Sequence, residues 1–178
     1  NLTAALLEQA FARDGMPTYA ENSCGHSVCH EDVLTLKGTS WLNDKVIDLC
    51  FWALQQRDTK QVWNLQKRVA TRNLFFRACF AVMLTTDTYM DYKNLAMWTK
   101  NADIFEQERL FFPVNIKQSH WVCVVVYVKE RTIVVFDSMG NKHEKLVLIF
   151  FRFLCNEHRC KKKNLWNTSG PFMQAICQ

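Results

Sequence analysis

A histidine and an aspartate flank two apolar segments in the middle of the chain, and this pair could perform acid–base chemistry. His120 opens the first apolar segment and Asp137 follows the second. An imidazole acts as a base near neutral pH when a carboxylate accepts a hydrogen bond from its other ring nitrogen, which fixes the tautomer. Such a pair could activate a thiol nucleophile. A partly solvated histidine and an aspartate that starts a turn are the alternative explanation.

Two β-strands joined by a short turn would have to bring these side chains together. Residues 119–128 and 132–136 are rich in β-branched and aromatic side chains, and the polar residues 129–131 separate them. In an antiparallel hairpin the start of the first strand and the end of the second lie at the same end of the sheet. The pattern therefore predicts that His120 and Asp137 are neighbours.

Strands and helices are predicted around this hairpin. Residues 109–116 are strand-like, but Pro113 inside them favours an edge or kinked strand beside the hairpin. Residues 142–158 have the apolar spacing of an amphipathic helix. Residues 73–76 fit either a short strand or the start of a helix. The order of elements, helices first, then strands and then a helix, indicates an α+β fold.

Three helices and an irregular stretch are predicted before residue 99. Asn43 suits the N-cap of an amphipathic helix of about three turns that begins at Asp44. Residues 2–13 and 89–98 also have helical spacing, whereas residues 18–40 are polar and irregular.

Composition predicts one globular domain over residues 1–178. The chain is 49% hydrophobic and has a net charge of +5, with Lys161-Lys162-Lys163 as its basic cluster. Because no basic stripe is present, nucleic acid is not expected as a partner. No signal peptide opens the sequence, and no apolar run approaches the ~20 residues that span a bilayer. We therefore expect an intracellular, nuclear or cytoplasmic monomer without a membrane partner.

The eight cysteines are interpreted as reduced thiols, several of them packed in apolar segments, such as Cys50, Cys79 and Cys123. Two Cys/His clusters lack the tight two-residue Cys spacing of common zinc modules. No metal and no other cofactor is therefore predicted. The clusters are Cys24, His26, Cys29 and His30, and Cys155, His158 and Cys160.

Five separated segments closely resemble the ubiquitin-like protease family of SUMO-specific (sentrin) cysteine proteases. The resemblance covers about residues 30–178, with residues 1–29 as an N-terminal extension. It implies a papain-like α+β fold with a central mixed or antiparallel sheet flanked by helices. The segments are SWLND at 40–44, WTKNADIF at 98–105, PVNI at 113–116, SHW at 119–121 and VFDSMG at 135–140.

The resemblance also implies roles for individual residues. His120 would be the general base and Asp137 the residue that orients it. Trp41 and Trp121 match tryptophans that close over the diglycine tail of the modifier, where any Cβ would collide with the rings. Asp44 matches a position near the modifier-binding surface, although helix capping is a competing reason for it. The implied partner is SUMO or another ubiquitin-like protein, removed from lysine side chains or matured after Gly-Gly.

One part of the family pattern is missing from the sequence. In the family the nucleophile lies in a Gln-x-x-Gly-x-Asp-Cys-Gly motif after the aspartate, and the sequence contains no such motif. Gln178 stands where the family glutamine might fall and is the candidate oxyanion residue. Cys177 is a poor substitute nucleophile, because one following residue cannot supply a helix N-terminus.

Two hypotheses about function therefore remain open. The first is a protease domain that ends before its nucleophile, incomplete at its C-terminus and inactive as this fragment. The second is a catalytically dead module that binds a ubiquitin-like modifier.

Overall fold

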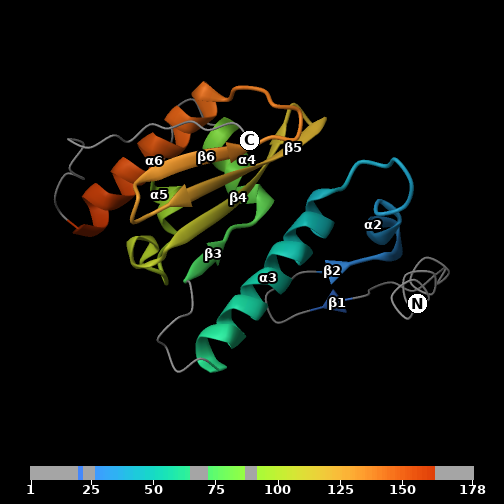
Figure 1. Ribbon diagram of the computed structural model, residues 1–178, viewed down its shortest axis with the longest axis horizontal. Helices are drawn as coiled ribbons and strands as arrows, with labels where there is room; N and C mark the ends of the chain where they lie inside the picture. The colour runs from blue at the N-terminus through green and yellow to red at the C-terminus, as the bar shows by residue number, and fades with distance from the viewer. Residues whose placement is uncertain (1–19, 22–26, 65–71, 87–91, 163–178) are drawn as a thin grey trace. The chain divides into compact units, whose positions relative to one another are not determined.

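The computed structural model describes residues 20–21, 27–64, 72–86 and 92–162 (Figure 1). The chain divides into two compact units, residues 1–53 and 54–178, with the boundary inside helix α3 (Asp44–Asn64). The helix predicted at residues 2–13 lies outside the described residues. A single domain over the whole chain stays a prediction.

A four-stranded mixed sheet forms the centre of the second unit. β3 runs parallel to β4, and the β4–β5 and β5–β6 pairs are antiparallel, in the order β3-β4-β5-β6. The predicted α+β class and the predicted hairpin are therefore confirmed, and residues 73–75 form a strand. The strands are β3 (Asn73–Phe75), β4 (Arg109–Ile116), β5 (His120–Tyr127) and β6 (Thr132–Phe136).

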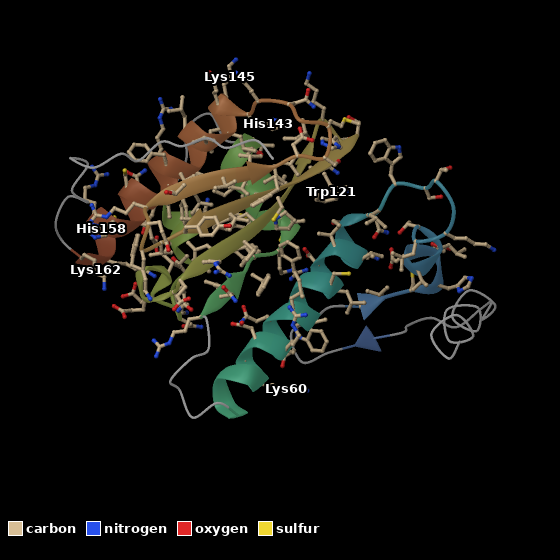
Figure 2. All side chains as sticks on the ribbon, in the orientation of Figure 1. Lys60, Trp121, His143, Lys145, His158 and Lys162 are labelled. Carbon is tan, nitrogen blue, oxygen red and sulfur yellow. The ribbon has the colours of Figure 1, made fainter. Side chains whose placement is uncertain are left out.

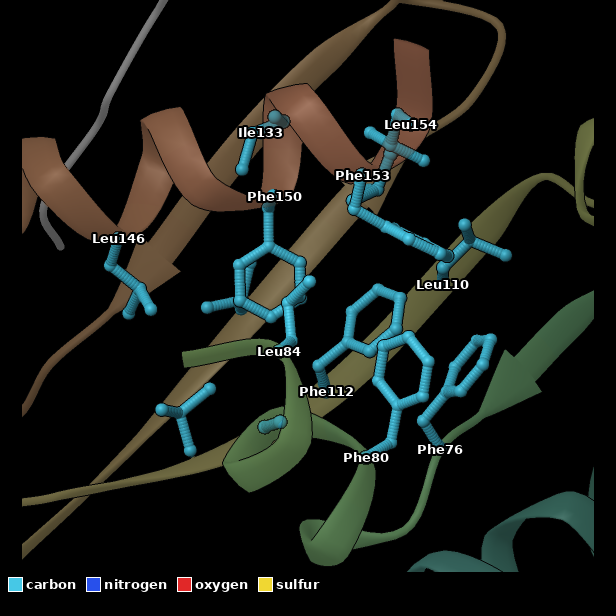
Figure 3. Packing of buried hydrophobic residues seen from close by; sticks show 14 of the residues in the cluster. Phe76, Phe80, Leu84, Leu110, Phe112, Ile133, Leu146, Phe150, Phe153 and Leu154 are labelled. Carbon is cyan, nitrogen blue, oxygen red and sulfur yellow. The ribbon is translucent and has the colours of Figure 1, made fainter. Parts of the chain in front are cut away.

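Helices α4 (Ala78–Thr86) and α6 (Glu144–Lys162) pack with one face of this sheet to form the core. Phe80 of α4 and Phe112 of β4 are fully buried, with ring centroids 5.5 Å apart. Phe150 of α6 packs against Phe112 at 4.8 Å (Figure 3). Burial of one such side chain contributes roughly 1.5–3 kcal/mol, so this aromatic cluster fixes α4 and α6 to the sheet.

The position of β4 corrects a prediction. Pro113 favoured an edge or kinked strand beside the hairpin. β4 does lie beside the hairpin, paired with β5, but it is not an edge strand because β3 pairs with its other side. β3 pairs with residues 109–111 of β4, so Pro113 lies beyond the end of β3 in the described sheet. A proline, which has no N–H to donate, is tolerated there because that side of β4 is not paired.

Helix α3 is longer than the predicted three turns and contains 21 residues. Asn43 caps it as predicted, because its Oδ1 accepts a hydrogen bond from the backbone N–H of Val46 at 3.0 Å. Beyond residue 54 the helix turns polar side chains towards β3. The Gln55 side chain bonds the backbone of Asn73 and Phe75, so this contact face was not recognisable from hydrophobic spacing.

Three further segments differ from the predictions. Residues 18–40, predicted to be irregular, contain strands β1 (Ala20–Glu21) and β2 (Ser27–Val28) and helix α2 (His30–Leu34). The helix expected over residues 89–98 is the short α5 (Tyr92–Ala96) in the described residues, followed by a 3-10 turn, η1 (Ile104–Glu106). Helix α6 continues past residue 158 to Lys162.

None of the helices in the described part of the chain is long and apolar enough to cross a membrane.

Candidate active site

The hairpin of β5 and β6 brings His120 and Asp137 into direct contact. Val122, Val124 and Val126 face the core from β5, and strand alternation places His120 on the same face. Val124 pairs with Val135, so Asp137, two residues further along, also belongs to that face. Nε2 of His120 lies 2.5 Å from Oδ1 of Asp137.

The carboxylate of Asp137 is buried and fully engaged. Its side chain is 0% exposed. Oδ1 accepts from His120 and from the N–H of Met139 at 2.8 Å. Oδ2 accepts from Nε2 of His143 at 2.7 Å and from the backbone and side-chain N–H groups of Asn141 at 3.3 and 3.2 Å.

These hydrogen bonds decide the charge of Asp137. Burial raises the pKa of the carboxyl group, but hydrogen bonds from His143, Met139, His120 and Asn141 outweigh burial and hold the pKa well below its usual range. An ionised carboxylate only accepts hydrogen bonds. Nε2 of His120 is therefore the donor, and Nδ1 of the neutral ring carries the lone pair that can take a proton.

A tight turn after β6 places backbone hydrogen-bond donors around the Asp137 carboxylate. The N–H of Gly140 donates to the carbonyl oxygen of Asp137 at 3.0 Å, which closes the turn over residues 137–140. Gly140 has φ +69°, in the left-handed region that glycine adopts readily. The chain thereby reverses and directs the Met139 and Asn141 amides at the carboxylate.

A second turn, between β4 and β5, sets the position of His120. Lys117 and Gln118 have φ 51° and 57°, and the N–H of Ser119 donates to the carbonyl of Ile116 at 3.1 Å. Left-handed conformations cost a non-glycine residue roughly 1–2 kcal/mol. The base therefore begins its strand directly after a strained turn, and its side chain is 13% exposed. In the described part of the chain, Nδ1 of His120 has no hydrogen-bond partner.

The other predicted site residues lie in different environments. Trp121 is half-buried on β5 (Figure 2). It follows His120 in the strand, so strand alternation places it on the face opposite the core. Trp41 belongs to the first unit, precedes α3 and is 62% exposed. Asp44 is exposed in the first turn of α3 and accepts from the N–H of Lys45. Gln178 and Cys177 lie outside the described residues.

Three of the thiols in the described residues, those of Cys123, Cys155 and Cys29, are poorly suited to nucleophilic attack. Burial raises the pKa of Cys123 to about 11 and also raises that of Cys155. Cys29 donates its Sγ–H to Asp32 at 3.0 Å. Cys50, predicted to pack in an apolar segment, is exposed. No group of three metal-binding side chains occurs among the described residues.

Sequence reasoning missed His143. It lies six residues after Asp137, just before α6, and its side chain is also 13% exposed (Figure 2). A histidine after a turn-forming Asp-Ser-Met-Gly is a weak signal in the sequence. Its contact with Asp137 depends on how the turn directs the chain back over the carboxylate.

A protein-family sequence model described as "Ulp1 protease family, C-terminal catalytic domain" matches residues 40–164 of the chain. The chain belongs to the Ulp1 protease family. The matched residues of this Ulp1-family chain include Trp41, His120, Trp121 and Asp137.

Curated proteins similar to the chain are sentrin-specific proteases. Human sentrin-specific protease 2 is 30% identical over 133 residues, which are 75% of this chain and 21% of that protein. Mouse sentrin-specific protease 3 is 35% identical over 120 residues, 67% of this chain and 18% of that protein. The Ulp1-family chain thus spans about a fifth of the length of these relatives.

Solved structures of Ulp1-type domains share the fold. The C-terminal Ulp1 protease domain in complex with Smt3, the yeast ortholog of SUMO, superimposes with a TM-score of 0.71. The two sequences are 20% identical, over 97% of this chain and 72% of that one. The Ulp1-like SUMO protease catalytic domain of Chaetomium thermophilum has a TM-score of 0.76 at 17% identity, over 97% of this chain and 67% of that one. These matches confirm the papain-like α+β fold.

Proposed function

We propose that this chain carries the base and the orienting carboxylate of a thiol protease domain for ubiquitin-like modifiers. The observation that carries the proposal is the contact of His120 with the buried, ionised Asp137, in a chain of the Ulp1 protease family. The bond cleaved follows the C-terminal Gly-Gly of SUMO or a related modifier. Similarity to sentrin-specific proteases supports this substrate, either as a conjugate on lysine or as a precursor.

His120 and Asp137 have separate roles in the proposed cleavage reaction. Nδ1 of His120 takes the proton of a cysteine thiol, and the thiolate attacks the carbonyl carbon of the terminal glycine. The C–N bond breaks as the imidazolium gives its proton to the leaving amine. Water then attacks the thioester carbonyl while His120 takes one of its protons. The C–S bond breaks, and the imidazolium returns that proton to the sulfur, which regenerates the thiol. Asp137 accepts from Nε2 throughout and stabilises the imidazolium.

The nucleophile is the missing part of this scheme. The printed sequence contains no Gly-x-Asp-Cys-Gly motif, and the raised pKa values of Cys123 and Cys155 keep these thiols protonated near neutral pH. We therefore propose that the chain as printed binds a modifier but does not form an acyl-enzyme. Three earlier expectations stay predictions. They are the role of Gln178 as an oxyanion residue, the contact of Asp44 with the modifier, and a nuclear or cytoplasmic location.

Covalent capture tests this proposal directly. The printed chain is incubated with SUMO that carries an electrophilic C-terminus, and adduct formation is followed by gel shift and mass spectrometry. We expect no adduct in the wild type or in Cys177→Ala. An adduct that disappears in Cys177→Ala would show that the chain holds its own nucleophile, and the inactive part of the proposal would be wrong.

A pure modifier-binding module is the second candidate function, and Trp121 tests the binding that both candidates require. Trp121 is half-buried beside His120, where we propose that its indole borders the path of the diglycine tail. Truncation of a central aromatic contact typically costs about 2 kcal/mol, or about 30-fold in Kd. Trp121→Ala should therefore weaken SUMO binding by this order in calorimetric titration.

Tyr127→Ala is the matched control for this measurement. Tyr127 lies on the same strand and the same face as Trp121, at the far end of β5, where Arg109 stacks on its ring at 5.7 Å. We expect the affinity of Tyr127→Ala for SUMO to stay close to that of the wild type. Equal affinities of wild type and Trp121→Ala would remove Trp121 from the binding site.

A further inference from the structure

His143 is a second imidazole on the carboxylate that orients the base. Its Nε2 lies 2.7 Å from Oδ2 of Asp137, opposite the oxygen that contacts His120. Its backbone is held by the start of α6, because its carbonyl oxygen accepts from the N–H of Val147 at 3.0 Å. A rigid helix end therefore carries this imidazole to the carboxylate.

The two oxygens of Asp137 have different sets of donors. Oδ1 is held by His120 and by the N–H of Met139. On Oδ2 the bond from His143 is the shortest, at 2.7 Å, because the two bonds from Asn141 are 3.3 and 3.2 Å long. His143 is thus the best-placed donor on the second oxygen.

Holding one oxygen of a carboxylate restricts the other. Rotation about the Cβ–Cγ bond of Asp137 would move both oxygens together, so a short bond to Oδ2 keeps Oδ1 facing Nε2 of His120. The side chains of His120 and His143 are both 13% exposed and that of Asp137 is 0% exposed. Water has little access to this position and would not readily replace a lost donor. Loss of the His143 donor would therefore weaken the hydrogen bond between Oδ1 of Asp137 and Nε2 of His120.

We propose that His143 is a positioning residue that fixes the Asp137 carboxylate, so that His120 keeps its proton on Nε2 and presents an unprotonated Nδ1. This proposal deepens the proposed function and rests on it for the role of His120 as a base. His143 is not assigned any contact with substrate; it acts through Asp137. Sequence resemblance assigned no role to this residue.

The proposal requires a definite proton position in the wild-type protein. The ionised Asp137 can only accept, so neutral His143 must carry its proton on Nε2. Nitrogen-15 NMR of the labelled chain at alkaline pH distinguishes the two neutral tautomers. Finding His143 in the Nδ1–H form would overturn the proposal without any substitution.

Two variants of similar size separate the hydrogen bond from packing. His143→Gln keeps an N–H donor and His143→Met removes it. The readout is exchange of the His120 Nε2–H proton with water, measured by NMR. Coupling between contacting groups of roughly 1.4 kcal/mol predicts that this exchange becomes about tenfold faster in His143→Met and returns most of the way in His143→Gln.

Controls identify a merely structural effect. His158 lies within α6, the helix that begins directly after His143, and packs edge-on against Phe105 with ring centroids 4.9 Å apart. His158→Met should therefore leave the His120 proton unchanged. Amide exchange in β5 should be equal in all folded variants. Equal exchange of the His120 proton in wild type and His143→Met, or equal acceleration in the Met and Gln variants, would overturn the proposal.

The measurement is independent of the proposed function. It uses the chain without a modifier and requires no nucleophile. Absence of SUMO binding, or an adduct in the capture experiment, would therefore leave the role of His143 in the dyad intact. A negative result for His143 would in turn leave the binding and capture results intact.

Discussion

At the scale of single residues, the charge of Asp137 is the property on which the site depends. Burial raises the pKa of its carboxyl group, and the donors around it, His143 first among them, lower the pKa further than burial raises it. The pKa of a carboxyl group in the unfolded chain is about 3.9. The folded value lies below this, so ionised Asp137 stabilises the fold above about pH 4. This contribution is lost as the pH falls towards the folded pKa.

Asp137→Asn tests this linkage. The amide cannot ionise, so the difference in free energy of unfolding between wild type and variant should be largest near pH 6. It should shrink as the pH falls below about 4, because the unfolded chain then takes up a proton that folded Asp137 does not. Urea unfolding at a series of pH values measures it. A difference that stays constant down to about pH 3 would show that Asp137 gains nothing from its charge.

At the scale of elements, two turns place the reacting groups. Lys117 and Gln118 adopt left-handed conformations immediately before β5, and Gly140 does so after β6. The left-handed conformation is costly for Lys117 and Gln118, which have a Cβ, whereas glycine adopts it readily. Backbone strain of this kind is concentrated at functional sites. Arg131, in the turn at the other end of β5, is left-handed as well (φ 52°), so the turn before His120 positions the base but does not by itself identify the site.

A buried charge network holds α6 against the segment that contains α5 and η1. Glu157 is 0% exposed, forms an ion pair with Lys161 at 2.8 Å and accepts from the hydroxyl of Tyr92. Burial and Glu157 both raise the pKa of Tyr92, so the phenol remains a donor. Lys161 also donates to the carbonyls of Thr99 and Ala102 at 2.5 and 2.8 Å. One lysine thus forms an ion pair with a buried carboxylate and donates hydrogen bonds to two backbone carbonyls.

Neighbouring lysines allow a matched test of this network. Lys161→Met leaves Glu157 charged and buried without its cation. Removing one partner of a buried pair costs about 3–5 kcal/mol, and the partial exposure of Lys161 reduces our expectation to about 2 kcal/mol. Lys162→Met breaks the ion pair between Lys162 and Asp103, in which the two side chains are 36% and 35% exposed respectively. This substitution should lower the free energy of unfolding by less than about 1 kcal/mol. Urea unfolding compares the variants, and equal losses would contradict the assigned role of Lys161.

At the scale of the whole molecule, the second unit alone contains His120, Asp137, His143 and Trp121, all supported by one mixed sheet and its core helices. The base and its carboxylate stand at the ends of β5 and β6, whose residues are all buried or half-buried. A packed core limits the motion of such strand ends. The dyad is therefore held by strands that are packed into the core.

Local patterns in the sequence were sufficient for the hairpin and for the pairing of His120 with Asp137. Strand alternation and a short polar turn determine which residues share a face, and both are properties of neighbouring residues. The capping of α3 by Asn43 follows from the same kind of local chemistry. Separated motifs were also sufficient to indicate the family that the comparison identified.

Tertiary structure alone decided the remaining contacts of the site. The central position of β4 depends on its pairing with β3, and the polar contact face of α3 appears only when Gln55 meets the backbone of Asn73. His143 reaches Asp137 because the turn at Gly140 reverses the chain before α6. These contacts join groups whose proximity depends on the path of the backbone, whereas periodicity and residue type report only the neighbours along the chain.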